Sequence, residues 1–184
     1  MTVYNIDLAG ANSAEDIRAS ARTGLRLPEG YEISVPSLRE ALARHIETPC
    51  MIQVRGVADF HQFDGYPSEL AKSKNALFDI LEEAAKRDSA ITARFSFTID
   101  FTPVKTAWDF HESIRVGLEM PKEYGNNLDA LWDVLTGFIA TPCVVYVRGA
   151  ETLPVEFRED IDQVMGLFAK AREYGAGVTV IQVE

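Results

Sequence analysis

Two aspartates, Asp129 and Asp133, lie four residues apart in the stretch from Tyr124 to Gly137. On a helix this spacing places both carboxylates on one face, where like charges repel each other by roughly 0.2–0.5 kcal/mol. The helix dipole stabilises the negative charge of Asp129 in the first turn but stabilises that of Asp133, one turn further on, very little. Aspartate is also a weak helix former in mid-helix. Carboxylates held at this pitch could accept charge-assisted hydrogen bonds from a cationic partner, or could bind a metal ion.

Simpler interpretations of the same residues remain open. Two aspartates on a helix are most often a solvated face, and Trp132 between them is more often a core residue than a recognition group. A metal site has weak support because no third ligand follows at a suitable spacing. A local cost without local compensation often marks a functional site, but from spacing alone the solvated face remains the favoured interpretation.

The residues around the aspartates predict a short helix over residues 127–139. Gly125 can adopt a left-handed turn without strain from a Cβ atom, and Asn127 is a suitable N-cap. Apolar residues then recur at helical spacing and predict a buried stripe: Leu128, Leu131, Leu135 and Phe138.

The run YGNNLDALWDVLTG, from Tyr124 to Gly137, resembles the signature of the barstar family, intracellular inhibitors of a secreted bacterial ribonuclease. The resemblance also takes in Leu118, Met120 and Pro121 before the run. After the run it includes Thr141-Pro142, the strand that follows and the last helix and strand, so that it covers about half of the chain.

The resemblance implies a protein inhibitor that mimics RNA phosphate within the basic cleft of a ribonuclease. Asp133 would take the place of the substrate phosphate and accept hydrogen bonds from arginine, Asp129 would face a second cation, and Gly137 would allow close approach of the enzyme. Carried over position by position, the partner-binding residues are Glu123, Asn126, Asn127, Leu128, Asp129, Ala130, Trp132, Asp133, Thr136, Gly137, Leu167 and Lys170.

Two of these positions depart from the family pattern. Glu123 stands where the family commonly has a tyrosine, and Lys170 stands where a glutamate of the last helix aligns. A cation facing a basic enzyme should weaken binding to barnase itself. We therefore expect a different cognate ribonuclease, with an acidic group or a gap opposite Lys170.

Composition and charge agree with a protein partner. The 184 residues are 47% apolar, and 28 acidic against 18 basic residues give a formal net charge of −10. An acidic surface repels nucleic acid and anionic membranes and attracts cationic proteins.

The N-terminus has no positively charged region, and no run reaches the ~18 apolar residues of a membrane span, so we expect a soluble cytoplasmic protein that is a monomer when free. Cys50 and Cys143 each follow Thr-Pro and are expected to be buried thiols rather than a disulfide.

The chain also contains an internal repeat. A shift of 93 residues aligns residues 3–56 with residues 96–149 without a gap, and 19 of these 54 positions are identical. The second half of each repeat realigns if the first carries a six-residue insertion between Ala58 and Ser73, where Gly65 and Pro67 suggest a loop. We predict an α/β protein made of two tandem barstar-like units, residues 1–94 and 95–184, each a small three-stranded parallel sheet packed with helices.

Hydrophobic periodicity places the elements of both units. In the first unit, strands are expected at residues 3–8, at 50–54 and from 91, with helices at 14–23, 34–46 and 74–87. In the second, strands are expected at 97–101, 144–147 and 178–183, with helices at 106–116, 127–139 and 161–174. Residues 91–101 alternate apolar and polar without Gly or Pro, which predicts a strand that leads directly from one unit into the other and fixes them rigidly together.

The first unit retains the fold positions but not the site. Asp129, Trp132 and Asp133 correspond to Pro36, Arg39 and Glu40. Either this unit is a scaffold or secondary contact, or it binds another target or a second face of the same toxin.

An enzymatic function has little support. The histidines, His45, His61 and His111, lack partners at catalytic or metal-ligand spacing, and neither a phosphate-binding glycine loop nor a nucleophile elbow is present. We therefore predict a non-enzymatic inhibitor without a cofactor, an immunity protein against a ribonuclease toxin. The alternative is a barstar-like binding module that does not inhibit and acts in assembly or regulation.

Overall fold

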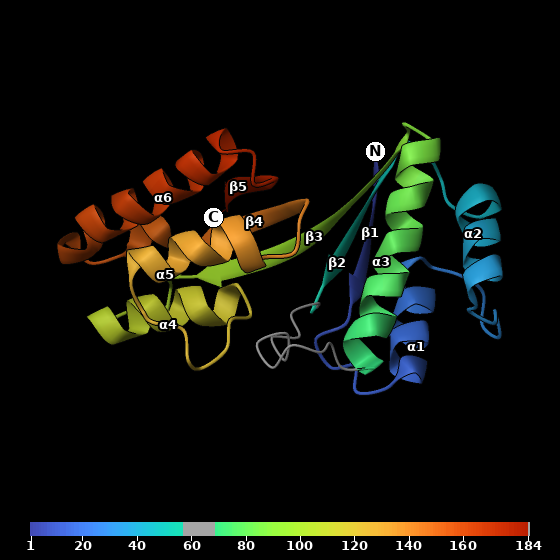
Figure 1. The fold of residues 1–184 in the computed structure, drawn as a ribbon, viewed down its shortest axis with the longest axis horizontal. Helices are drawn as coiled ribbons and strands as arrows, with labels where there is room; N and C mark the ends of the chain where they lie inside the picture. Colours follow the sequence, from blue (N-terminus) through green and yellow to red (C-terminus); the bar gives the residue numbers. More distant parts are fainter. Residues whose placement is uncertain (57–68, 184) are drawn as a thin grey trace. The chain divides into compact units, whose positions relative to one another are not determined.

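The computed structural model describes residues 1–56 and 69–183, which fall into two compact units, Met1–Phe95 and Ser96–Glu184 (Figure 1). Each unit combines parallel strands with helices, so the predicted α/β class is confirmed. Among the described residues, none of the helices combines the length and the apolar character needed to cross a lipid bilayer.

In the described part of the first unit, three helices pack with parallel strands. In chain order its elements are β1 (Thr2–Asp7), α1 (Ala14–Gly24), α2 (Val35–Arg44), β2 (Cys50–Arg55), α3 (Glu69–Arg87) and the first half of β3 (Ile91–Asp100). Strand β1 pairs in parallel with β2, with Thr2 opposite Cys50, and β2 pairs in parallel with β3, with Cys50 opposite Ile91. Helix α3 contacts both α1 and α2.

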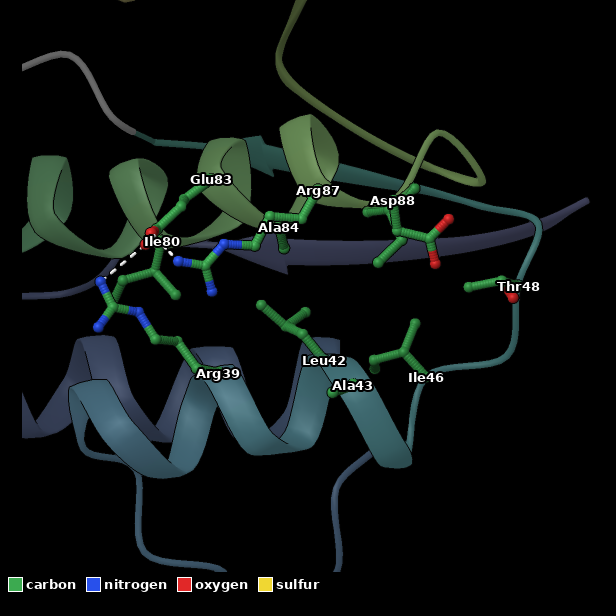
Figure 2. Close-up of a pocket in the computed structure, with 11 residues that line it drawn as sticks. Arg39, Leu42, Ala43, Ile46, Thr48, Ile80, Glu83, Ala84, Arg87 and Asp88 are labelled. Atoms are coloured by element: carbon green, nitrogen blue, oxygen red, sulfur yellow. Dashed lines mark hydrogen bonds and ion pairs between the residues drawn. The ribbon is translucent and has the colours of Figure 1, made fainter.

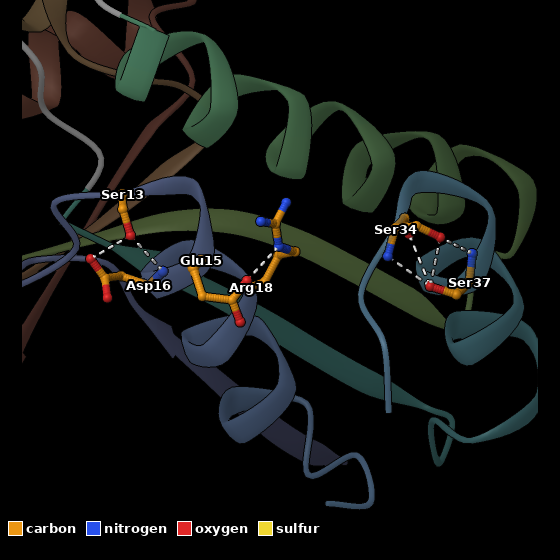
Figure 3. Close-up of polar contacts among 6 residues, drawn as sticks. All are labelled: Ser13, Glu15, Asp16, Arg18, Ser34 and Ser37. Carbon is orange, nitrogen blue, oxygen red and sulfur yellow. Dashed lines mark hydrogen bonds and ion pairs between the residues drawn. The ribbon is translucent and has the colours of Figure 1, made fainter. Parts of the chain in front are cut away.

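Side-chain caps fix where the first two helices begin (Figure 3). The Ser13 hydroxyl accepts a hydrogen bond from the Asp16 N–H at 3.1 Å and donates to the Asp16 carboxylate at 2.8 Å. Hydrogen bonds from the Asn12 N–H and from Ser13 lower the pKa of Asp16. At α2, Ser34 and Ser37 form a reciprocal capping box. These caps satisfy N–H groups that the helix itself leaves unpaired, which confirms the predicted helix starts near residues 14 and 34.

The second unit repeats the pattern with a modified central helix. After β3 come α4 (Ala107–Gly117), α5 (Leu128–Asp133), a π-helical turn (Val134–Phe138), β4 (Cys143–Arg148), two 3₁₀ turns (Ala150–Thr152 and Val155–Phe157), α6 (Arg158–Glu173) and β5 (Val178–Val183). Strands β4 and β5 pair in parallel, with Cys143 opposite Val178.

Strand β3 belongs to both units. It runs without interruption from Ile91 to Asp100, and the sheet has the order β1-β2-β3-β4-β5. One face of β3 is buried along its whole length, with Phe97 at 3% exposure and Ile99 at 0%. The predicted continuous strand is therefore confirmed. Because β3 is both the last strand of the first unit and the first strand of the second, the three strands expected for each unit give five in the described sheet.

The same backbone details recur at positions separated by 93 residues. A Cβ atom on Gly24 would lie 2.5 Å from the Asn5 carbonyl oxygen, and one on Gly117 would lie 2.6 Å from that of Thr98. In each unit a helix therefore approaches the first strand so closely that only glycine fits. Further pairs are the positive-φ residues Arg26 and Glu119, the positive-φ glycines Gly56 and Gly149, and the cis peptide bonds Thr48-Pro49 and Thr141-Pro142.

Some expectations need correction or lie outside the described residues. Helix α3 begins at Glu69, five residues before the predicted start, so the predicted loop does not extend to Ser73. The remainder of that loop, including Gly65, Pro67 and His61, lies outside the described residues. Cys50 and Cys143 are buried thiols rather than a disulfide, as expected.

The contact at Gly117 predicts a large effect of a single methyl group. Gly117→Ala should lower the free energy of unfolding by about 1–3 kcal/mol, because the new Cβ would meet the backbone of Thr98 and Ile99. Gly166→Ala is the matched control, since a Cβ there meets nothing within 4 Å, and it should stabilise α6 by up to about 1 kcal/mol. Urea unfolding of the full chain measures both. Equal effects of the two variants would contradict the tight helix–strand contact.

Candidate functional site

The loop before α5 is held by a buried tyrosine and an asparagine cap. The Tyr124 hydroxyl donates to the Asn127 carbonyl oxygen at 3.2 Å. The Asn127 side chain accepts from the Ala130 N–H at 2.8 Å and donates to the Gly125 carbonyl oxygen at 3.0 Å. Asn127 is therefore the N-cap that the sequence predicts.

The left-handed residue of this loop is not the glycine. Asn126 has φ of +47°, whereas we expected the left-handed turn at Gly125. Asparagine tolerates this conformation better than most residues, so the turn does not require glycine. Gly125 has a different role, because a Cβ atom there would lie 3.1 Å from the Asn127 side-chain nitrogen that binds the Gly125 carbonyl.

Helix α5 buries one edge and presents both aspartates to solvent. Leu131 and Leu135 are 0% and 1% exposed. Asp129 and Asp133 are exposed, and within residues 1–56 and 69–183 neither carboxylate forms a hydrogen bond or an ion pair. Leu128, Ala130 and Trp132 are half-buried between these two sides. The two carboxylates are thus available to groups outside the described chain.

The predicted helix does not remain α-helical to residue 139. From Val134 the turn widens to π geometry, and the Ile139 N–H donates to the Val134 carbonyl oxygen at 2.8 Å. The wider turn rotates the following side chains relative to an α-helix, so Phe138 is 52% exposed rather than part of the buried stripe that we predicted. Half-buried Thr136 donates to the Trp132 carbonyl oxygen at 2.8 Å, and Gly137 is exposed with open space where a Cβ would lie.

Helix α6 adds a second edge to this surface. It packs against α5, and it carries the half-buried Leu167 and the exposed Lys170. The sequence analysis missed Tyr174, which follows the last residue of α6, is 75% exposed and has its ring 5.9 Å from that of Trp132 at an interplanar angle of 61°. Tyr174 lies four residues after Lys170 and seven after Leu167, and residues at these separations share one face of a helix. This spacing could have identified Tyr174 from the sequence.

Glu123 lies at the other end of the surface, in the exposed loop before Tyr124. The nearby Glu112 carboxylate binds Arg115 at 2.6 Å and raises its pKa, and the charge of Glu123 adds to that effect. The predicted residues therefore come from three neighbouring segments of the second unit: the 123–127 loop, α5 with its π turn, and α6.

This surface is suited to binding a cationic partner. Two exposed carboxylates one turn apart can accept charge-assisted hydrogen bonds from arginine or lysine, and the half-buried Trp132 supplies apolar area beside them. Within the described ranges, no group of three or more His, Cys, Asp or Glu side chains could hold a metal ion. His45 caps the end of α2 and the half-buried His111 lies in α4, so these two histidines are in different units.

The second half of the chain is similar in sequence to known proteins. The family described as Barstar (barnase inhibitor) matches residues 94–183, a range that includes every predicted partner-binding residue. The chain is also 33% identical over 63 residues to the protein named "Putative ribonuclease inhibitor YrdF" of Bacillus subtilis (strain 168), an alignment that covers 34% of this chain and 69% of that protein. The chain belongs to the barstar family. Membership of the barstar family indicates a non-enzymatic protein whose partner is a ribonuclease.

Burial of Tyr124 predicts a pH dependence in the barstar-like loop. Burial raises the pKa of Tyr124 from 10.0 to about 12. The fold thus favours the neutral phenol, so this contribution to stability is complete below pH ~10 and is lost as the pH rises through about 12. A phenolate absorbance titration should show a transition near pH 12 that disappears in Tyr124→Phe. If Tyr124→Phe instead removed a transition near pH 10, the Tyr124 ring would not be buried.

Proposed function

We propose that this protein is an immunity protein that blocks the active site of a cognate bacterial ribonuclease toxin with the exposed face of α5. The observation that supports this function is that Asp129 and Asp133 point to solvent without a partner in the described chain, while Leu131 and Leu135 anchor the opposite edge of the helix. The proposal places the protein in the cytoplasm, as a monomer when free.

Inhibition would depend on phosphate mimicry. A ribonuclease must surround the RNA phosphate with cationic donors, and a carboxylate can accept the same hydrogen bonds. Asp133 would occupy the phosphate position, and Asp129 would face a second cation one helical turn away. Neither carboxylate would first have to leave an ion pair within the described chain, so binding would not be opposed by the loss of an existing contact.

The first unit serves in this proposal as a scaffold rather than as a second inhibitor. Glu40 stands at the position of Asp133, but its carboxylate lies 3.3 Å from the guanidinium of Arg44, which stands at the position of Gly137. The position of Asp129 is occupied by Pro36. The recurring glycines, positive-φ residues and sequence identities support an origin of both units by tandem duplication, after which only the second kept the carboxylate pair.

Charge removal at α5 tests the function. The protein should be purified together with the ribonuclease encoded beside its gene, and inhibition of RNA cleavage measured. Asp133→Ala should weaken inhibition by about 100-fold or more, because the enzyme cations would remain buried without a partner, and Asp129→Ala should weaken it less. Inhibition should also weaken as salt is raised.

The matched control is Glu40→Ala, which removes an acid at the corresponding position of the first unit and should leave inhibition unchanged. If Asp129→Ala and Asp133→Ala protected as well as the parent protein, the inhibitor function would be excluded. A complex with the ribonuclease that leaves its activity intact would support the alternative of a non-inhibitory binding module.

Lys170 provides a test of partner choice. Lys170→Glu should tighten binding to barnase by about tenfold, because it removes a cation from a surface that faces a basic enzyme. Lys105→Glu makes the same change of charge at an exposed residue just before α4 and should have a much smaller effect. Titration calorimetry measures both variants. An equal gain from the two would mean that net charge, and not contact at α6, sets the affinity.

A further inference from the structure

The first unit has a pocket of about 290 Å³ between α2 and α3 (Figure 2). Apolar side chains line it from one end to the other, among them Ile80 of α3, Leu42 of α2 and Ile46 just after α2, and charged side chains stand toward its ends. This volume is near the lower limit of pockets that hold small molecules.

One end of the pocket is cationic. The Glu83 carboxylate accepts hydrogen bonds from Arg39 at 2.7 Å and from Arg87 at 2.5 Å, so a single acid bridges two guanidinium groups (Figure 2). Each guanidinium has five N–H donors, and within the described part of the chain Glu83 is the acceptor for both. Two cations against one anion leave a formal charge of +1 at this end, with further donors available to a ligand.

The other end of the pocket carries Asp88, beside Thr48 (Figure 2). The Asp88 carboxylate accepts a hydrogen bond from the Ala90 N–H at 2.9 Å, which holds it in the turn after α3. A ligand with one negative charge would therefore be oriented with that charge toward Arg39 and Arg87, because Asp88 would repel it at the opposite end.

The corresponding positions in the second unit have different chemistry. There, aromatic rings bridge the two helices, because Arg39 and Arg87 align with Trp132 and Tyr174. Glu83 aligns with Lys170. The groove between these helices thus carries an aromatic pair beside a lysine in the second unit and two arginines around a glutamate in the first.

We propose that the α2–α3 pocket binds a small monocarboxylate with an apolar body. The ligand carboxylate would accept hydrogen bonds from Arg39 and Arg87, and its chain would lie along Leu42, Ile46 and Ile80. Arginine suits this role because its planar donors match a carboxylate. The site is separate from the proposed ribonuclease contact and does not depend on it.

Titration of the full chain with hexanoate tests the pocket. Nuclear magnetic resonance should show shifts of the Leu42, Ile46 and Ile80 methyl groups. Acetate, which has the charge without the chain, and hexan-1-ol, which has the chain without the charge, should each bind at least about fivefold more weakly. Equal binding of hexanoate and hexan-1-ol, or shifts that map outside the pocket, would overturn the proposal.

Substitutions separate this site from the inhibitor surface. Arg39→Gln and Arg87→Gln should each weaken hexanoate binding at least about fivefold, with spectra that remain dispersed as in the parent protein. Arg44→Gln is the matched control, because Arg44 lies on the same helix but pairs with Glu40 outside the pocket lining, and it should have no effect. Asp133→Ala should also leave hexanoate binding unchanged. An Arg87→Gln variant that binds hexanoate normally would exclude the site.

Discussion

The rotational setting of α5 depends on the burial of Leu131 and Leu135. The α-helical part has only six residues, so its own hydrogen bonds contribute little to its stability, and packing must decide which side faces inward. With both leucines almost completely buried and Asn127 fixing the first turn, Asp129 and Asp133 have no position other than the surface. The exposure of the two aspartates is therefore a consequence of the packing of leucines two positions away in the sequence.

Electrostatic pairing distinguishes the two units more clearly than net charge does. On α2 and α3, Glu40, Glu82 and Glu83 each lie beside an arginine or lysine of the same unit. On α5, both acids lack such partners in the described chain. Exposed ion pairs contribute little to stability, but they do neutralise the charge that a partner would meet. Of these three helices, as far as the structure describes them, α5 is the one with two uncompensated negative charges four residues apart.

Local signals in the sequence predicted most of the fold, and long-range packing accounts for what they missed. The Asn127 cap and the alternation in β3 depend on residues close in sequence, and the structure confirms both. The π turn was missed because its hydrogen bonding leaves no mark on apolar spacing, and with it the exposure of Phe138. The contact between Trp132 and Tyr174 joins residues 42 positions apart, and no local pattern identifies such a pair. The α2–α3 pocket likewise depends on how two distant helices meet.

The position of the unit boundary within β3 affects how this chain can be dissected. The register of β2 runs along Ile91–Phe95, so every residue of β3 that pairs with β2 lies within the first unit. A cut between Phe95 and Ser96 would divide the ten-residue strand but would leave this pairing intact. A fragment that ends at Phe95 would therefore keep its own strand ladder and lose only the continuation of β3 to Asp100.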